Sequence, residues 1–159
     1  MMTERQANFR REYRSRIAGW YNGYAHVAVI YAIGLVAMYV YVAKIQNVQW
    51  WEWLVIPAVG IACNMFEWFL HMHIMHRPKN VRGLRAIYQR HTLNHHQFFT
   101  DQEMRFRDNQ DWRVTFFPPY ALIVFILMSA IGAAIVSVVL TTNAAWLLMA
   151  STTGMYLIY

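Results

Sequence analysis

The hydrophobic and polar positions of this chain fall in long blocks. No Asp, Glu, Lys or Arg occurs over residues 27–43, 53–66 and 114–159. A helix that spans the bilayer needs about 20 mostly apolar residues. The last block is long enough for two such helices, separated by the polar run Thr141-Thr142-Asn143. The pattern therefore predicts four transmembrane helices, at about residues 24–44, 50–71, 117–140 and 144–159.

A bundle of buried helices in a soluble protein is the alternative interpretation. It requires a polar face at helical spacing on each surface helix, and residues 120–140 have no such face. Only 14% of the residues are charged, against about 25% in soluble domains. We therefore expect an all-α, polytopic membrane protein, with a single membrane-embedded domain over residues 1–159.

The placement of positive charge predicts the orientation in the membrane. Of the 14 Lys and Arg residues, five precede the first span, eight lie between Arg77 and Arg113, and only Lys44 lies at the opposite helix ends. Short loops rich in Lys and Arg stay in the cytoplasm. The N-terminus and the loop over residues 72–116 are thus expected to be cytoplasmic. Topology accounts for the net charge of +6, so the bilayer is the expected partner and nucleic acid is not.

The cytoplasmic loop of about 45 residues is too long for a structureless connection. We expect helices within it, around Arg82–Asn94 and Glu103–Arg113. On the far side, Trp50, Trp51 and Trp53 are typical of an interfacial aromatic belt.

Six of the seven histidines occur close together, where the second predicted span ends and in the loop that follows: His71, His73, His76, His91, His95 and His96. His91 and His95 are four residues apart, so on a helix their rings lie one turn apart on the same face. His96 is rotated by about 100° from His95. It could address a second ion, or a second side of the first.

His71 and His76 are five residues apart, a spacing that does not align on an ideal α-helix. They converge if the helix ends or distorts there, and Pro78 biases Arg77 away from helical geometry. His73 and His76, three apart, form a rival pair. Glu67 lies one turn before His71, well placed to accept a ring N–H and fix the tautomer.

A set of imidazole ligands suits Zn, Cu, Fe or Ni. The loop carboxylates have no ligand-like spacing relative to the histidines: Asp101, Glu103, Asp108 and Asp111. We therefore predict a transition-metal site on the cytoplasmic side. His26 stands alone near the start of the first span and is interpreted as a hydrogen-bonded interfacial residue. The single cysteine, Cys63, excludes an intramolecular disulfide.

The histidine pattern resembles that of a known family. His71-x4-His76 followed by His91-x3-His95-His96 is similar to the first two histidine boxes of the membrane-bound fatty acid hydroxylase superfamily, which includes sterol desaturases and carotene hydroxylases. The flanking phrases Glu67-Trp-Phe-Leu-His71 and Met75-His76-Arg77-Pro78 also resemble that family. The resemblance covers residues 67–99, and the four-span topology extends it more weakly to the whole chain.

The resemblance implies a non-haem di-iron centre held by eight or more histidines. Such a centre activates O2 to hydroxylate or desaturate a lipid (a fatty acid, sterol or carotenoid), with electrons from a separate donor protein. Carried over residue by residue, the iron ligands would be His71, His76, His91, His95 and His96. His73 matches neither position of the first box and, like Glu67, would support the ligands. Aromatic residues around the boxes could line a lipid path or simply pack: Trp68, Phe69, Tyr88, Phe98 and Phe99.

The family's third box, usually His-x2-His-His, has no counterpart here, because no histidine follows His96. Five ligands hold one metal well and two poorly. We therefore expect this sequence to be a fragment whose third box lies beyond Tyr159, and the chain alone to be catalytically inactive.

Other functions stay open at this stage. The main alternative is a metal-binding or metal-transport membrane protein without oxygenase activity, although transporters place polar ligands near the bilayer midplane. A haem-binding electron-transfer subunit would leave the paired histidines unexplained. A zinc hydrolase would lack its usual His-Glu-x-x-His helix.

Overall fold

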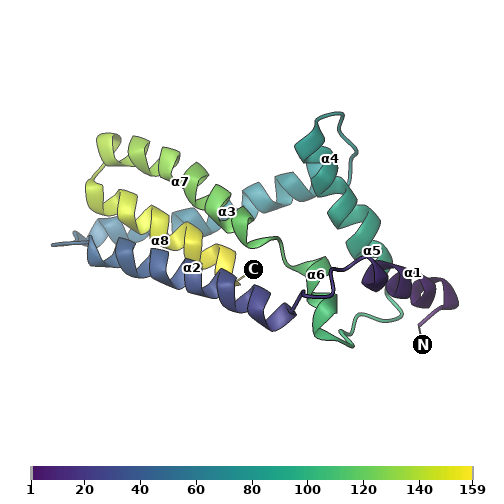
Figure 1. Cartoon of the computed structure of the whole chain (residues 1–159). Helices are drawn as coiled ribbons and strands as arrows, with labels where there is room; N and C mark the ends of the chain where they lie inside the picture. Colours follow the sequence, from purple (N-terminus) through teal and green to yellow (C-terminus); the bar gives the residue numbers. More distant parts are fainter. Residues whose placement is uncertain (1, 159) are drawn as a thin grey trace. The chain divides into compact units, whose positions relative to one another are not determined.

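A computed structural model describes residues 2–158, and its regular elements are all helices, which confirms the predicted all-α class (Figure 1). In chain order they are α1 (Glu4–Ser15), α2 (Gly23–Ala43), η1 (Trp50–Leu54), α3 (Val55–Leu70), η2 (His71–Met75), α4 (Arg82–Tyr88), η3 (Gln89–His95), α5 (His96–Phe98), η4 (Asn109–Asp111), α6 (Trp112–Thr115), α7 (Pro119–Val139) and α8 (Thr142–Ile158). An isolated bridge joins Thr100 and Glu103.

Three helical stretches in the described part of the chain are long and apolar enough to cross a membrane: Gly23–Ala43, Trp50–Met75 and Asn109–Val139, the last of which is interrupted at residues 116–118 between α6 and α7. They contain the first three predicted spans almost completely. The fourth apolar segment forms α8, which has 17 residues. The polar run Thr141-Thr142-Asn143 separates the two helices as predicted: Thr141 lies in the turn after α7, and Thr142 and Asn143 begin α8.

Packing divides the chain into two compact units. The first contains the residues up to Val27 together with Glu67–Phe117, and the second contains Ala28–Phe66 and the residues from Pro118 onward. All six clustered histidines belong to the first unit.

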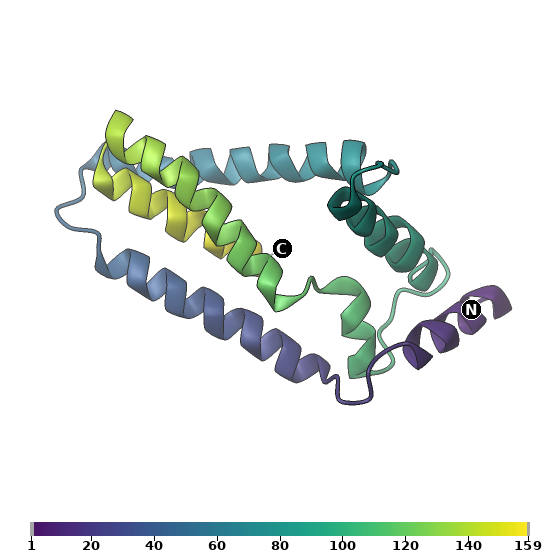
Figure 2. The same ribbon diagram turned by 45° about the horizontal axis from the view of Figure 1, so that its top comes forward.

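In the second unit, α7 and α8 run antiparallel side by side (Figures 1 and 2). Its core contains Tyr41, Ala133, Ala145 and Met149, and the Tyr41 ring stacks on Trp146 with centroids 6.0 Å apart. Small residues at such contacts let membrane helices approach closely.

A buried carboxylate secures one end of the second unit. Glu52 is only 1% exposed. It accepts hydrogen bonds from the backbone N–H of Gln49 at 2.7 Å, from the Thr141 hydroxyl, and from Asn143 Nδ2 at 3.3 Å. These bonds tie η1 to the turn between α7 and α8.

The expected helix over Arg82–Asn94 is present and continues to Phe98 through α4, η3 and α5. The expected helix over Glu103–Arg113 is wrong for its first half, because helical structure there begins only at Asn109. The physical reason is that side chains form hydrogen bonds with backbone carbonyl groups that would accept the intrahelical hydrogen bonds of a helix. Arg10 binds the carbonyl oxygens of Glu103 and Arg105.

Gly23 is the position in the first unit where a side chain fits least. A Cβ atom there would overlap the backbone carbonyl of Asn109, which has no rotamer with which to move away. We predict that Gly23→Ala lowers the free energy of unfolding by about 3 kcal/mol, the upper range for overpacking. Gly19→Ala is the matched control, since nothing lies within 4 Å of its Cβ position. Denaturant unfolding in micelles measures both, and equal stability of the two variants would contradict the packing described here.

Candidate metal centre

Two π-helical turns bring the histidines together. Helix α3 continues directly into η2, and α4 continues into η3. Within these turns the backbone N–H of His76 donates to the carbonyl of His71 at 3.3 Å, and the N–H of His96 donates to the carbonyl of His91. Bonds from residue i+5 to residue i define a π-turn. Each turn therefore superposes two histidines that are five residues apart.

The paired ring nitrogens have the spacing of neighbouring ligands on one ion. Nε2 of His71 and Nε2 of His76 are 2.9 Å apart, and the Nε2 atoms of His91 and His96 are 3.2 Å apart. Two nitrogens at about 2.1 Å from one metal and at right angles would be about 3.0 Å apart. The geometry of each pair thus fits a shared transition-metal ion.

The two pairs face each other. One ring nitrogen from each of His71, His76, His91 and His96 lies within 4.8 Å of the others. Ring centroids are 4.7 Å apart between His71 and His91, and 4.9 Å between His76 and His96. The hydroxyl of Thr92 donates to the carbonyl of Met75 at 2.5 Å and so joins η3 to η2. We call these four histidines the tetra-histidine group.

His95 adjoins the tetra-histidine group without joining it. Its ring is parallel to that of His91, 5.5 Å away, as the predicted spacing of four residues requires. It also lies 5.6 Å from His96 and contacts Phe99 at 5.3 Å. The π-turn, however, makes His96 the residue whose nitrogen meets that of His91. The role of His95 as a metal ligand stays a prediction.

We predict different consequences for the two adjacent histidines. His96→Ala removes a nitrogen of the tetra-histidine group and should abolish tight binding of the first ion, whereas His95→Ala should leave that ion bound. Metal titration of the two purified variants tests this. Loss of the tight ion in H95A with retention in H96A would mean that the helix has α-helical rather than π-helical register in solution.

The two supporting residues occupy different surroundings. Glu67 Oε1 lies 3.7 Å from Nδ1 of His71, within ion-pair distance but beyond hydrogen-bond distance, so its role in orienting that ring stays a prediction. His73 instead packs against Phe69 and Trp68, with centroids 4.9 and 6.2 Å away. Its rival pairing with His76 is not formed. Of the flanking aromatics, Phe98 and Phe99 are buried beneath α1, so they serve packing.

Three of the clustered histidines, His91, His95 and His96, have lowered pKa values. Burial, reinforced by the neighbouring rings, lowers the pKa of His91 from 6.5 to about 4. Burial likewise lowers the pKa values of His95 and His96, again with contributions from neighbouring imidazoles. Neutral imidazole is the form that binds metal, so the ring lone pairs are available at neutral pH.

The lowered pKa of His91 predicts a pH dependence of stability for the metal-free protein. Between pH 6.5 and about 4 the unfolded chain binds a proton at His91 that the folded protein does not. The free energy of unfolding should therefore fall as the pH is lowered through this window. Unfolding of metal-free wild type and His91→Gln at several pH values measures the effect, which should be smaller in the variant. The same pH profile for both would contradict it.

Helix α1 caps the helix that carries the second group of histidines. Arg10 is 1% exposed and donates to the carbonyl oxygens of Phe98, Glu103 and Arg105 at 2.8–3.0 Å. Its guanidinium also lies 4.5 Å from the ring centroid of Phe98. Gln6 donates to the carbonyls of Phe98 and Glu103, each at 2.9 Å. A carbonyl at a helix C-terminus lacks an intrahelical partner, and α1 supplies one.

Two further contacts fix the first unit. Arg14 forms a bidentate pair with the buried carboxylate of Asp111, at 2.7 and 2.8 Å. Arg90, on η3, donates to the carbonyls of Arg113 and Phe116. The sequence showed these arginines only as positive charge.

His26 is a structural residue, as predicted. Its Nε2 lies 2.9 Å from the carbonyl oxygen of Phe117, which can only accept, so Nε2 carries the proton. Its Nδ1 accepts from the Tyr21 hydroxyl at 2.8 Å. Both ring nitrogens are therefore used, and His26 takes no part in the tetra-histidine group.

No protein-family model, curated protein or solved structure matches the chain. The chemistry must therefore be argued from the donor set itself. Four imidazole ligands suit iron, zinc, copper or nickel, and disfavour magnesium and calcium.

Proposed function

We propose that this protein is an O2-dependent oxygenase that hydroxylates or desaturates a lipid at the cytoplasmic face of a membrane, using non-haem iron. The observation that carries the proposal is the tetra-histidine group, whose first pair lies at the end of a stretch long and apolar enough to span a bilayer. The resemblance of residues 67–99 to the histidine boxes of the fatty acid hydroxylase superfamily supports the same reading. It also supports a centre of two irons.

The protein's own residues have distinct tasks in this proposal. His71, His76, His91 and His96 would hold one iron, and His95, on the same helix as His91 and His96, would be available to a second. Glu67 fixes the His71 ring. Bound iron would supply the activation of O2. A separate redox protein delivers electrons.

The surface next to the first histidine pair suits a substrate that lives in the bilayer. Trp68, Phe69 and Met72 are 60%, 48% and 45% exposed. These apolar side chains adjoin His71 in sequence, so a lipid chain that contacts them is brought beside the metal ligands without leaving an apolar environment. Tyr88, on α4, stays a candidate for the same path.

The topology that we propose has four spans, with α8 as the fourth. Its 17 residues reach the lower end of the spanning range of about 17–25. The excess of Lys and Arg before α2 and between η2 and α7 supports a cytoplasmic location for the N-terminus and the histidines.

The test is anaerobic loading of the purified full-length protein with Fe(II), followed by measurement of O2 uptake and lipid products with a reductant. Iron binding, together with O2 uptake that requires both lipid and reductant, is the expected result. His76→Ala should lose iron and O2 uptake together, while His26→Ala should retain bound iron. A protein that takes up no iron and consumes no O2 with any lipid would end the oxygenase proposal.

A metal-binding or metal-transport membrane protein without oxygenase activity is the second candidate. It is favoured by the fact that the four grouped donors match the coordination number of a single zinc ion. One tightly held zinc per chain, with no O2 uptake after iron loading, would support it over the oxygenase.

A further inference from the structure

A shallow, open surface groove lies beside α1 and reaches His96 of the tetra-histidine group, and Arg5, His96 and Gln97 are exposed along it. Two cavities, of about 450 and 260 Å³, share Arg5, Phe9 and Gln97 as lining residues. The smaller one is also lined by His96 and Thr100. The shared residues make the two cavities adjoin, so a molecule in the groove lies against α1 at one end and against a predicted metal ligand at the other.

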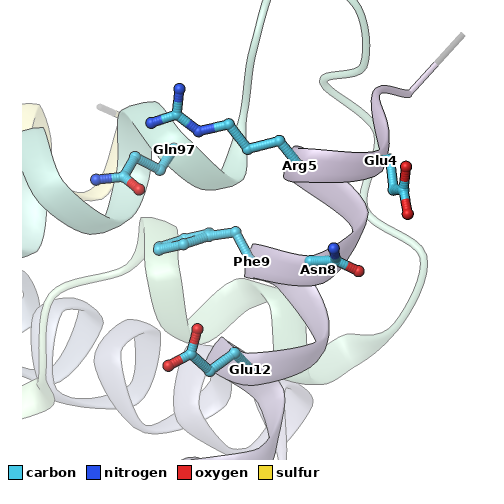
Figure 3. A pocket seen from close by; sticks show the side chains of 6 residues that line it. All are labelled: Glu4, Arg5, Asn8, Phe9, Glu12 and Gln97. Carbon is cyan, nitrogen blue, oxygen red and sulfur yellow. The ribbon is translucent and has the colours of Figure 1, made fainter.

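Arg5 and Gln97 are the polar side chains that line both cavities. Figure 3 shows the Arg5 side chain extending from α1 toward Gln97, with the Phe9 ring beneath the two side chains. Neither side chain has a hydrogen bond or ion pair within residues 2–158. A guanidinium binds carboxylate or phosphate oxygens through two parallel N–H groups, and a glutamine amide donates in addition.

The carboxylates that line the larger cavity would not repel an anion bound beside Arg5 and Gln97. Glu12 is paired with Arg16 one turn along α1. Glu4 points away from Arg5 and Gln97 (Figure 3). The Arg5 charge is therefore uncompensated on the side where Gln97 lies, and Phe9 gives an apolar floor to the same space.

We propose that this groove binds the acidic headgroup, carboxylate or phosphate, of an amphiphile. Arg5 and Gln97 bind the anion, and Phe9 contacts the first carbons of the attached chain. Identification of this amphiphile as the substrate class rests on the proposed function. His96 in the groove wall then places the headgroup site next to the metal ligands. The site itself requires neither iron nor turnover.

Calorimetry tests the site. The titration measures binding of dodecyl phosphate to the metal-free full-length protein in uncharged maltoside micelles. The variants are Arg5→Gln and the matched control Arg11→Gln, which removes the same charge from an exposed arginine of the same helix outside both cavities. Loss of a bidentate charge-assisted contact should weaken binding about tenfold or more in R5Q. R11Q should bind like wild type, and Gln97→Ala should lose affinity by a smaller factor.

Dodecanol and inorganic phosphate complete the experiment. Dodecanol should bind more weakly than dodecyl phosphate and be insensitive to R5Q, and inorganic phosphate should compete only at much higher concentration. Equal affinity of R5Q and wild type, or equal losses in R5Q and R11Q, would overturn the site. Inorganic phosphate that competes as well as dodecyl phosphate would overturn its assignment to an amphiphile. Failure of the iron and O2 test would leave Arg5-dependent binding intact, so the two proposals fail separately.

Discussion

Replacement of His91 by alanine is expected to lower the affinity for a divalent transition metal by about 100-fold or more. His91 lies at the centre of the histidines, with ring centroids 4.7–5.5 Å from those of His71, His76, His95 and His96. Loss of a residue that merely supports a ligand costs about 10–100-fold in metal affinity, so loss of a central ligand should reach or exceed that range. Anaerobic titration with Co(II) or Fe(II) measures the change.

His73→Ala provides the matched control for His91→Ala. It also removes a histidine side chain, but from η2, where His73 packs against Phe69 and lies outside the tetra-histidine group. We expect its metal affinity to stay close to that of wild type. If H73A and H91A lost affinity equally, the effect would be a general loss of structure, and the assignment of His91 would fail.

Replacement of Arg10 by alanine should have the second largest effect, although Arg10 touches no histidine. The substitution leaves three carbonyl oxygens without their charged donor and removes the guanidinium stacked on Phe98. A hydrogen bond to a charged group is worth about 1.5–3 kcal/mol. We therefore expect the free energy of unfolding to fall by about 3 kcal/mol, allowing for partial replacement of the lost bonds by water.

Metal affinity should fall with stability in Arg10→Ala, because the carbonyl of Phe98 ends the helix that carries His91, His95 and His96. Arg10→Lys should recover only part of the loss, since a lysine ammonium cannot reproduce the planar fork. Arg11→Ala, at an exposed position of the same helix, should change stability by less than about 0.5 kcal/mol. Denaturant unfolding and metal titration of the three variants measure both effects. Equal behaviour of R10A and R11A would contradict the capping role of α1.

Three of the four predicted apolar helices could be read from the sequence as long and apolar enough to span a membrane, because this property depends only on length and the absence of charge. The location of the histidine cluster could also be read from the sequence, since six histidines fall together around the end of the second block. The sequence could not show which nitrogens meet. Helical periodicity paired His91 with His95, whereas a π-turn pairs His91 with His96. In both pairs, His71 with His76 and His91 with His96, the two histidines are five residues apart. This shared spacing was the signal in the sequence from which the π-turns could have been predicted.

The loop after the histidines was predicted least well. A helix was expected from Glu103, but residues 100–108 are held in irregular structure by Arg10, Gln6 and Asp111. Gln6 and Arg10 lie more than 90 residues from the Glu103 carbonyl that they bind. Local propensity contains no information about such contacts. For the same reason Arg10 looked like one more charge that orients the chain in the membrane.

X-ray absorption spectroscopy of the purified, metal-loaded protein shows whether His71, His76, His91 and His96 bind a transition metal together. We expect the metal to be surrounded mainly by nitrogen at about 2.0–2.1 Å, with the outer-shell scattering of several imidazole rings, and we expect that signal to be lost in His91→Ala. A shell without imidazole scattering, or the same spectrum in wild type and H91A, would contradict it.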